Sequence, residues 1–151
     1  KVVTAEEMLQ ACQKLLPVNI AICTAAVVDY YPEYKKEKIK KDNINNHDLK
    51  LTENVDILKF LSNKSNQRPE LVVGFSAETE NVLKNSLMKL DSKKCDWIIA
   101  NDVSDKSIGF NSDNNEVTII YKNKMTEKIS KTSKSEIASE VVTRIIKFLG
   151  H

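Results

Sequence analysis

The chain has 151 residues, of which 41% are hydrophobic, and its 23 lysines and arginines nearly balance its 21 aspartates and glutamates. This length is typical of one domain, so we expect residues 1–151 to form a single unit around one core. The near balance of charge excludes an overall electrostatic attraction to nucleic acid or to an anionic membrane. The longest apolar run, residues 18–28, is interrupted by Asn19 and Thr24 and is too short to span a bilayer.

The start of the chain and its cysteines bear on the cellular compartment of the protein. The chain opens without an initiating methionine and without a signal-peptide pattern, so we expect a truncated start. Cys12, Cys23 and Cys95 are odd in number and widely spaced, which argues against a disulfide framework or a zinc site and favours the reducing cytoplasm. Cys23 could be a nucleophile, but its apolar neighbours favour a small buried side chain.

The first third of the chain predicts a helix, a strand and a long loop. Thr4 and Glu7 have the spacing of a capping box, and the apolar spacing that follows predicts a helix over residues 4–16. Residues 18–23 are a continuous apolar run, typical of a central parallel strand that is covered on both faces. Residues 29–46 are rich in tyrosine and lysine and predict a long excursion outside the core.

The rest of the chain alternates short apolar runs with stretches of helical spacing. The expected elements are a short strand at Leu49 and Leu51, a helix over 55–61, a strand over 71–75, a helix over 79–93, a strand over 97–100, a turn over 111–115, a strand over 117–121 and a helix over 134–149. This alternation predicts an α/β fold: a three-layer, Rossmann-like, mostly parallel sheet with helices on both faces.

Small and polar residues follow the predicted strands, where open α/β sheets bind ligands. Thr24, Ala25 and Asp29 follow the first strand, Ser76 to Thr79 follow the second, and Asn101 with Asp102 follow the third. Small residues let a base or a phosphate approach the backbone, and carboxylates can hold Mg²⁺. Ordinary turns and caps would have the same composition, so both interpretations stay open.

Two lysine clusters flank these strand ends. One contains Lys35, Lys36, Lys38, Lys40 and Lys41, and the other contains Lys84, Lys89, Lys93 and Lys94. Such clusters are solvated faces in many proteins, but they could also converge on a triphosphate. The chain has neither a P-loop nor a complete dinucleotide fingerprint, so lysines would have to hold the phosphates of any nucleotide.

The order of six segments resembles one family, the bacterial phosphopantothenate–cysteine ligases. The segments are Val3-Thr4-Ala5-Glu6-Glu7-Met8, Ala25-Ala26-Val27-Val28-Asp29-Tyr30, Glu37-Lys38-Ile39-Lys40-Lys41, Val73-Gly74-Phe75-Ser76-Ala77-Glu78-Thr79, Ala100-Asn101-Asp102-Val103-Ser104 and Gly109-Phe110-Asn111-Ser112-Asp113-Asn114. The resemblance implies a Mg²⁺-dependent ligase of coenzyme A synthesis. Such a ligase uses CTP to activate 4′-phosphopantothenate as an acyl cytidylate, from which the amine of cysteine displaces CMP.

The resemblance also implies a role for particular residues. It places the nucleotide base against Cys23, Thr24 and Ala25 and puts Asp29 close by. Lys38 would be the catalytic residue, reaching both the triphosphate and the activated carboxylate. The remaining residues that would bind the nucleotide are Val55, Asp56, Ile57, Leu58, Phe75, Lys89 and Lys93. No residue is assigned as a metal ligand.

This chain departs from the family pattern in three ways. Val55 stands where the family has a proline, Val28 and Ser76 replace alanines, and the glycine-rich N-terminal segment is absent from these residues. A separate chain carrying that segment is therefore an expected partner, and a homodimer is expected by resemblance, with residues 117–121 as a suitable edge strand. The alternatives are a catalytically incomplete remnant or nucleotide-binding module, and a nucleotide-sugar or flavin-binding protein.

Overall fold

The computed structural model describes residues 1–33, 49–63, 66–104 and 113–150. Its elements in chain order are α1 (Ala5–Leu15), β1 (Ile20–Cys23), β2 (Tyr30–Pro32), β3 (Leu51–Glu53), α2 (Ile57–Asn63), β4 (Leu71–Glu78), α3 (Val82–Lys93), β5 (Trp97–Asp102), β6 (Asn114–Tyr121), β7 (Thr126–Ser133) and α4 (Lys134–Phe148).

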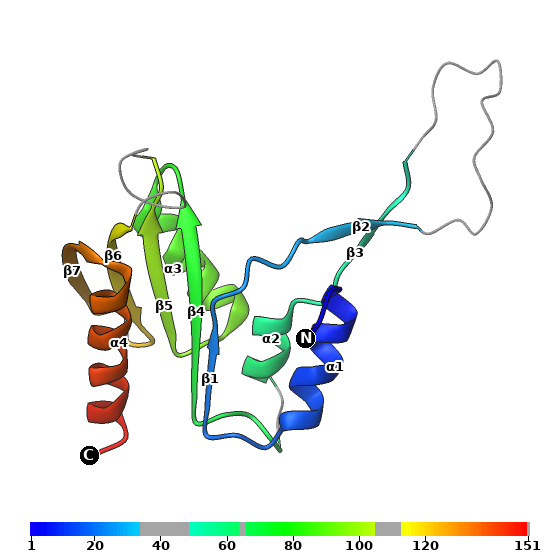
Figure 1. The fold of residues 1–151 in the computed structure, drawn as a ribbon, viewed down its shortest axis with the longest axis horizontal. Helices are drawn as coiled ribbons and strands as arrows, with labels where there is room; N and C mark the ends of the chain where they lie inside the picture. The colour runs from blue at the N-terminus through cyan, green and yellow to red at the C-terminus, as the bar shows by residue number, and fades with distance from the viewer. Residues whose placement is uncertain (34–48, 64–65, 105–112, 151) are drawn as a thin grey trace.

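Five strands form one sheet in the order β1-β4-β5-β6-β7 (Figure 1). Strands β1, β4 and β5 are parallel to one another. Strand β6 is antiparallel to β5, and β7 is antiparallel to β6, so β7 again points in the direction of β5. The sheet is therefore mostly parallel, and the predicted α/β, Rossmann-like class is confirmed.

Apolar side chains from alternate strand positions form a core on each face of the sheet. On one face, Val73, Trp97 and Ile99 pack with Val141 and Ile145 of α4. We call this the α4 face. On the other face, α3 covers Val72, Ile98 and Ile120, and α1 and α2 pack beside it against β1. The predicted three layers are thus present (Figure 1).

Two helices begin at capping boxes, which satisfy amide groups that a helix leaves unpaired at its start. The Thr4 hydroxyl accepts a hydrogen bond from the Glu7 amide at 3.1 Å, and the Glu7 carboxylate accepts from the Thr4 amide at 3.2 Å. Ser133 and Glu136 repeat this arrangement at the start of α4. The sequence prediction of the first helix start is confirmed to within one residue.

Several expected details of the sheet are wrong. Residues 117–121 belong to β6, which lies between β5 and β7, so this segment is not an edge. Asn114 and Asn115 were expected in a turn but begin β6. Strand β7 was not predicted, because only Ile129 among its residues is a buried apolar side chain. Strand β1, expected to be central, stands at an edge of the described sheet.

Strands β2 and β3 form a separate two-stranded antiparallel arm that projects from the body of the molecule (Figure 1). The short strand β2 lies inside the predicted excursion over residues 29–46, so that stretch is not loop throughout. Pro32 pairs with Leu51 at the outer end of the described arm, where the missing amide of a proline is tolerated. The described part of the excursion, residues 29–33, is exposed and lies outside the core, as expected.

Candidate functional site

A cavity of about 600 Å³ opens at the carboxyl ends of β1 and β4, where α/β sheets bind ligands. Its wall contains every described residue that the sequence analysis assigned to nucleotide binding: Cys23, Thr24, Ala25, Asp29, Val55, Asp56, Ile57, Leu58, Phe75, Lys89 and Lys93. Lys38 lies outside the described residues, as do the other lysines of its cluster. The roles of all these residues stay predictions.

Backbone geometry joins two distant segments of the wall. The Asn54 amide donates to the Asp29 carbonyl at 2.8 Å, and the Asn54 side chain donates to the Val28 carbonyl at 2.9 Å. These bonds fix the loop after β1 against the residues before α2. Thr24 and Ala25 of this loop and Val55 beside Asn54 all line the cavity.

Gly74 allows α2 to approach the floor of the cavity. A Cβ atom at this position would lie 2.5 Å from Leu58 Cδ2 and 3.0 Å from Ile98 Cδ1, well inside normal contact distances. A side chain at this position would require Leu58 or Ile98 to move. The close packing of α2 on β4 brings Ile57 and Leu58 into the cavity wall.

Lys89 and Lys93 enter the cavity from one face of α3, because residues four apart on a helix are neighbours. Lys93 pairs with Asp56, and Lys89 pairs with Glu78 at 2.7 Å. Asp56 also accepts from the Lys59 amide at 2.9 Å and so caps α2. Both lysines are therefore held in place by carboxylates.

Glu78 is the residue of this region whose role the sequence analysis missed. Burial disfavours its charged form, but hydrogen bonds from Lys89 and from the Ser76 hydroxyl outweigh burial and lower the pKa of Glu78 below its ordinary value. Glu78 is thus an anion that orients Lys89. The Lys89 pairing could not be foreseen because it joins the end of β4 to α3, and periodicity does not specify how the helix packs over the sheet.

The charges of the described cavity wall balance: Lys89 and Lys93 are opposed by Asp29 and Asp56. A triphosphate would therefore need further cations. No group of three or more metal-ligating side chains exists within the described residues. Mg²⁺ does not need one, since it is held by one or two carboxylates together with phosphate oxygens and water. The donor set at Asp29 and Asp56 fits that mode of binding.

Cys23 contributes a neutral wall rather than a nucleophile. Burial, followed by the nearby Cys12 and Asp56, raises the pKa of the Cys23 thiol to about 11. The thiol thus stays protonated at neutral pH and is a poor nucleophile. This agrees with the interpretation of Cys23 as a small apolar side chain, although its side chain is half-buried rather than fully buried.

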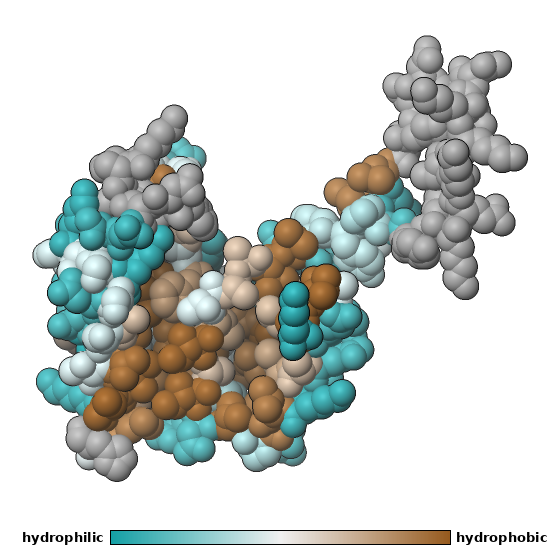
Figure 2. Space-filling model, in the orientation of Figure 1, coloured by the Kyte–Doolittle hydropathy of each residue, from teal (hydrophilic) through white to brown (hydrophobic). Residues whose placement is uncertain are grey.

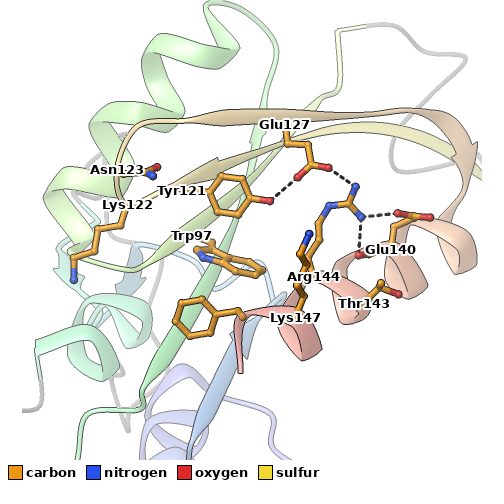
Figure 3. Close-up of a pocket in the computed structure, with 10 residues that line it drawn as sticks. Trp97, Tyr121, Lys122, Asn123, Glu127, Glu140, Thr143, Arg144 and Lys147 are labelled. Atoms are coloured by element: carbon orange, nitrogen blue, oxygen red, sulfur yellow. Dashed lines mark hydrogen bonds and ion pairs between the residues drawn. The ribbon is translucent and has the colours of Figure 1, made fainter. Parts of the chain in front are cut away.

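A second cavity, of about 670 Å³, lies where Trp97 begins β5 and α4 ends, away from the strand ends that form the first cavity. Glu127 accepts from Tyr121 and from Arg144, and Glu140 also accepts from Arg144 (Figure 3). The arginine is therefore neutralised by two carboxylates. This network ties α4 to β7, and we assign it a structural role.

No helix within the described parts of the chain has the length and apolar character to cross a membrane.

The family model of the DNA/pantothenate metabolism flavoprotein C-terminal domain matches residues 1–149. The chain is 41% identical over 149 residues to the coenzyme A biosynthesis bifunctional protein CoaBC of Haemophilus influenzae, covering 96% of the chain and 36% of the relative. It is 38% identical to CoaBC of Escherichia coli over 152 residues, covering 95% and 37%.

Solved structures show the same fold. The crystal structure of the C-terminal domain of CoaBC matches with a TM-score of 0.75 at 32% identity, covering 99% of this chain and 64% of that one. A Cab2 mutant in complex with phosphopantothenate-cysteine matches with a TM-score of 0.70 at 18% identity, covering 99% of this chain and 53% of that one. The chain thus spans little more than a third of its curated relatives.

Proposed function

We propose that this chain, which belongs to the DNA/pantothenate metabolism flavoprotein C-terminal domain family, is the nucleotide-binding part of a phosphopantothenate–cysteine ligase of coenzyme A synthesis. In this reaction the carboxylate of 4′-phosphopantothenate attacks the α-phosphate of CTP and releases pyrophosphate. The amine of cysteine then attacks the acyl cytidylate, forms the amide and releases CMP. One observation carries the proposal: every described residue predicted to bind the nucleotide lines a single cavity.

The lysines of α3 support phosphate binding. Lys89 and Lys93 are held by Glu78 and Asp56, so their ammonium groups are oriented before a ligand arrives. Preorganised cations stabilise the charge that accumulates on a leaving pyrophosphate. When the triphosphate binds, its oxygens would share or replace these carboxylates as partners of the lysines.

The balanced charge of the cavity supports a need for Mg²⁺ and for Lys38. Bound Mg²⁺ would neutralise the phosphates and act as a Lewis acid, and Asp29 or Asp56 would be its protein ligand. Lys38 would add the further cation near the reacting carboxylate. We propose Lys38 as the catalytic residue because of its place in the family motif. It lies outside the described residues.

The proposed partners are the substrates of this reaction and a second copy of the chain. A Cab2 mutant has been solved in complex with phosphopantothenate-cysteine, the product of this reaction, and it shares the fold of this chain. We also propose a homodimer, which the exposed Tyr30 and Leu51 of the projecting arm support. The three free cysteines are compatible with the cytoplasm, which we propose as the compartment. No role for nucleic acid or membrane is proposed.

The alternative is a catalytically incomplete module that needs a separate partner chain. The exposed apolar side chains of Ile22, Phe75 and Ile146 favour this alternative over a self-sufficient enzyme. The module would bind CTP but would not form the amide by itself. The two possibilities therefore differ in turnover and agree in nucleotide binding.

Calorimetric titration with CTP and Mg²⁺ tests the nucleotide half of the proposal. We expect saturable binding that prefers CTP to ATP and weakens about tenfold or more in Lys38→Ala and Lys93→Ala, because each loses a charge-assisted contact. Lys147→Ala, which alters the second cavity instead, is the matched control and should bind normally. A folded protein that binds no CTP, or that binds CTP and ATP equally, would contradict the proposal.

A further inference from the structure

A polar cluster adjoins Lys89 at the end of strand β4. It consists of Ser76 and Glu78 on β4 and of Asn85 and Lys89 on α3. We call these four residues the Glu78 cluster. Lys89 lines the candidate nucleotide cavity, whereas the other three residues are not part of its described wall. The cluster therefore reaches the cavity through Lys89.

The alternation of β4 and the repeat of α3 bring the cluster together. Ser76 and Glu78 are two residues apart on the strand and point to the same side as Val72, which α3 covers. Asn85 and Lys89 are four residues apart and share one flank of the helix. The intervening residues of the strand point to the α4 face, where Figure 2 shows a broad apolar area. The polar side chains at this strand end are thus gathered under α3.

Three donors converge on the carboxylate of Glu78. The Ser76 hydroxyl donates to its Oε1 at 2.6 Å, and the Lys89 ammonium lies 2.7 Å from the same oxygen. The Asn85 amide donates to Oε2 at 3.3 Å and to the Glu80 carbonyl at 3.0 Å. Although burial disfavours the charged form, these bonds lower the pKa of Glu78 below its ordinary value. Glu78 is therefore a charged group with a fixed position.

Ser76 fixes this carboxylate independently of Lys89. It is only 2% exposed, so water does not compete for its hydroxyl. A hydrogen bond from a hydroxyl to a carboxylate is charge-assisted and stronger than a bond between neutral groups. Glu78 thus keeps a partner on β4 when Lys89 also binds another anion.

The two lysines of the cavity are held in different ways. Asp56, the partner of Lys93, lines the cavity itself, so it would repel the phosphates of a nucleotide unless a cation stood between them. Glu78 lies outside the described wall. An ammonium group has three N–H donors, so Lys89 can bond Glu78 and phosphate oxygens at the same time. Lys89 can therefore bind a ligand without leaving its carboxylate.

We propose that Ser76 and Asn85 are positioning residues that hold Glu78 as a fixed anchor for Lys89, so that Lys89 binds the phosphates of a nucleotide from a preset position. This inference rests on the proposed function, because its ligand is the nucleotide of the same cavity. A cation that is already oriented costs less to order when the ligand arrives. Lys93, by contrast, shares its carboxylate with the ligand site and changes partners on binding.

Nuclear magnetic resonance of the isotope-labelled protein tests the anchor without nucleotide. The ammonium protons of Lys89, assigned by their loss in Lys89→Met, exchange with water more slowly when an ion pair holds them. We expect Ser76→Ala to speed this exchange at least twofold. Ser86→Ala is the matched control, because Ser86 is a fully buried serine of α3 whose hydroxyl has no hydrogen-bond partner within the described structure. It should leave the exchange unchanged.

Calorimetric titration with CTP and Mg²⁺ then tests what the anchor contributes to nucleotide binding. We expect Ser76→Ala, which removes no charge, to weaken CTP binding about fivefold, the cost of ordering one long side chain on binding. Asn85→Ala should weaken it less, because its bond to Glu78 is longer. In a Lys89→Met background Ser76→Ala should have no further effect, because Ser76 acts through Lys89. Ser86→Ala should bind CTP normally.

The outcomes separate this inference from the proposed function. Equal CTP affinity of the Ser76→Ala variant and the original protein would overturn the inference alone. A loss of affinity that persists in the Lys89→Met background would also overturn it, since Ser76 would then act on the fold in general. Unchanged exchange of the Lys89 ammonium in Ser76→Ala would overturn the anchor whether or not a nucleotide binds. A folded protein that binds no CTP would overturn the proposed function and this inference with it.

Discussion

Gly74 is the residue on which the packing of α2 against β4 depends most directly. A methyl group at this position would meet Leu58 Cδ2 at 2.5 Å. We therefore expect Gly74→Ala to lower the free energy of unfolding by about 1–3 kcal/mol, the usual cost of overpacking a filled core. Urea denaturation followed by circular dichroism measures this difference.

Leu58→Ala provides the control for this clash, because it removes the atoms that the new methyl group would meet. The double variant Gly74→Ala, Leu58→Ala should be less destabilised than the sum of the two single variants, as neighbouring residues are not additive. Additive losses would show that the strain arises elsewhere in β4.

The position of a cavity residue could be predicted where the signal was local. Thr24 and Ala25 follow the apolar run of β1, so their place after a strand end could be read from the chain. Phe75 was expected to end its strand, but β4 continues to Glu78. The pairs Lys93 with Asp56 and Lys89 with Glu78 could not, because they join residues from different elements. Such pairs depend on how α3 packs over the sheet, which periodicity does not specify.

The contact between α4 and β7 makes the stability of the fold depend on pH. Hydrogen bonds from Arg144 and then Tyr121 lower the pKa of Glu127 to about 2 (Figure 3). A carboxyl group with a lowered pKa stabilises the fold above its ordinary pKa of 4.5 and loses that contribution as the pH falls toward 2. Acid should therefore loosen α4 from the edge of the sheet.

The variant Glu127→Gln removes the charge of this carboxyl group and so measures its contribution to stability. We expect the variant to be less stable than the original protein by about 1 kcal/mol at most at pH 6, because the half-exposed ion pair is screened by water. The difference in Tm should shrink as the pH falls from 4.5 toward 2 and then disappear. Thermal unfolding over that pH range measures it, and a difference that stays constant with pH would count against this role of Glu127.

Strands that are rich in apolar residues were easier to predict from the sequence than strands that are polar. Strands β4 and β5 were found because they are continuous apolar runs buried on both faces. Strand β7 is an edge whose exposed side chains are lysine, serine and threonine, so it resembles a loop in sequence. The sequence of strand β1 predicts a place in the sheet interior, but among the described residues only β4 pairs with it, so β1 stands at an edge.

At the scale of the whole molecule, the arm of β2 and β3 needs a partner surface. A two-stranded sheet is marginally stable alone, and Tyr30, Pro32 and Leu51 form one exposed, largely apolar side of it. Asn54 anchors only the base of the arm, through its bonds to Val28 and Asp29. We expect the arms of two copies to pack together through this side.

The joint substitution Tyr30→Lys and Leu51→Lys tests this association, because it places positive charges on the apolar side of both arms. Light scattering should give the original protein twice the chain mass of 17.1 kDa and the variant the chain mass itself. Thr52→Lys, on the opposite side of the arm, should leave the dimer unchanged. A dimer that survives the joint substitution would place the interface elsewhere, and a monomeric original protein would mean that the arm meets a different chain. Since the arm adjoins Asp29 at the cavity, loss of the dimer should also weaken CTP binding by positioning the wall less firmly.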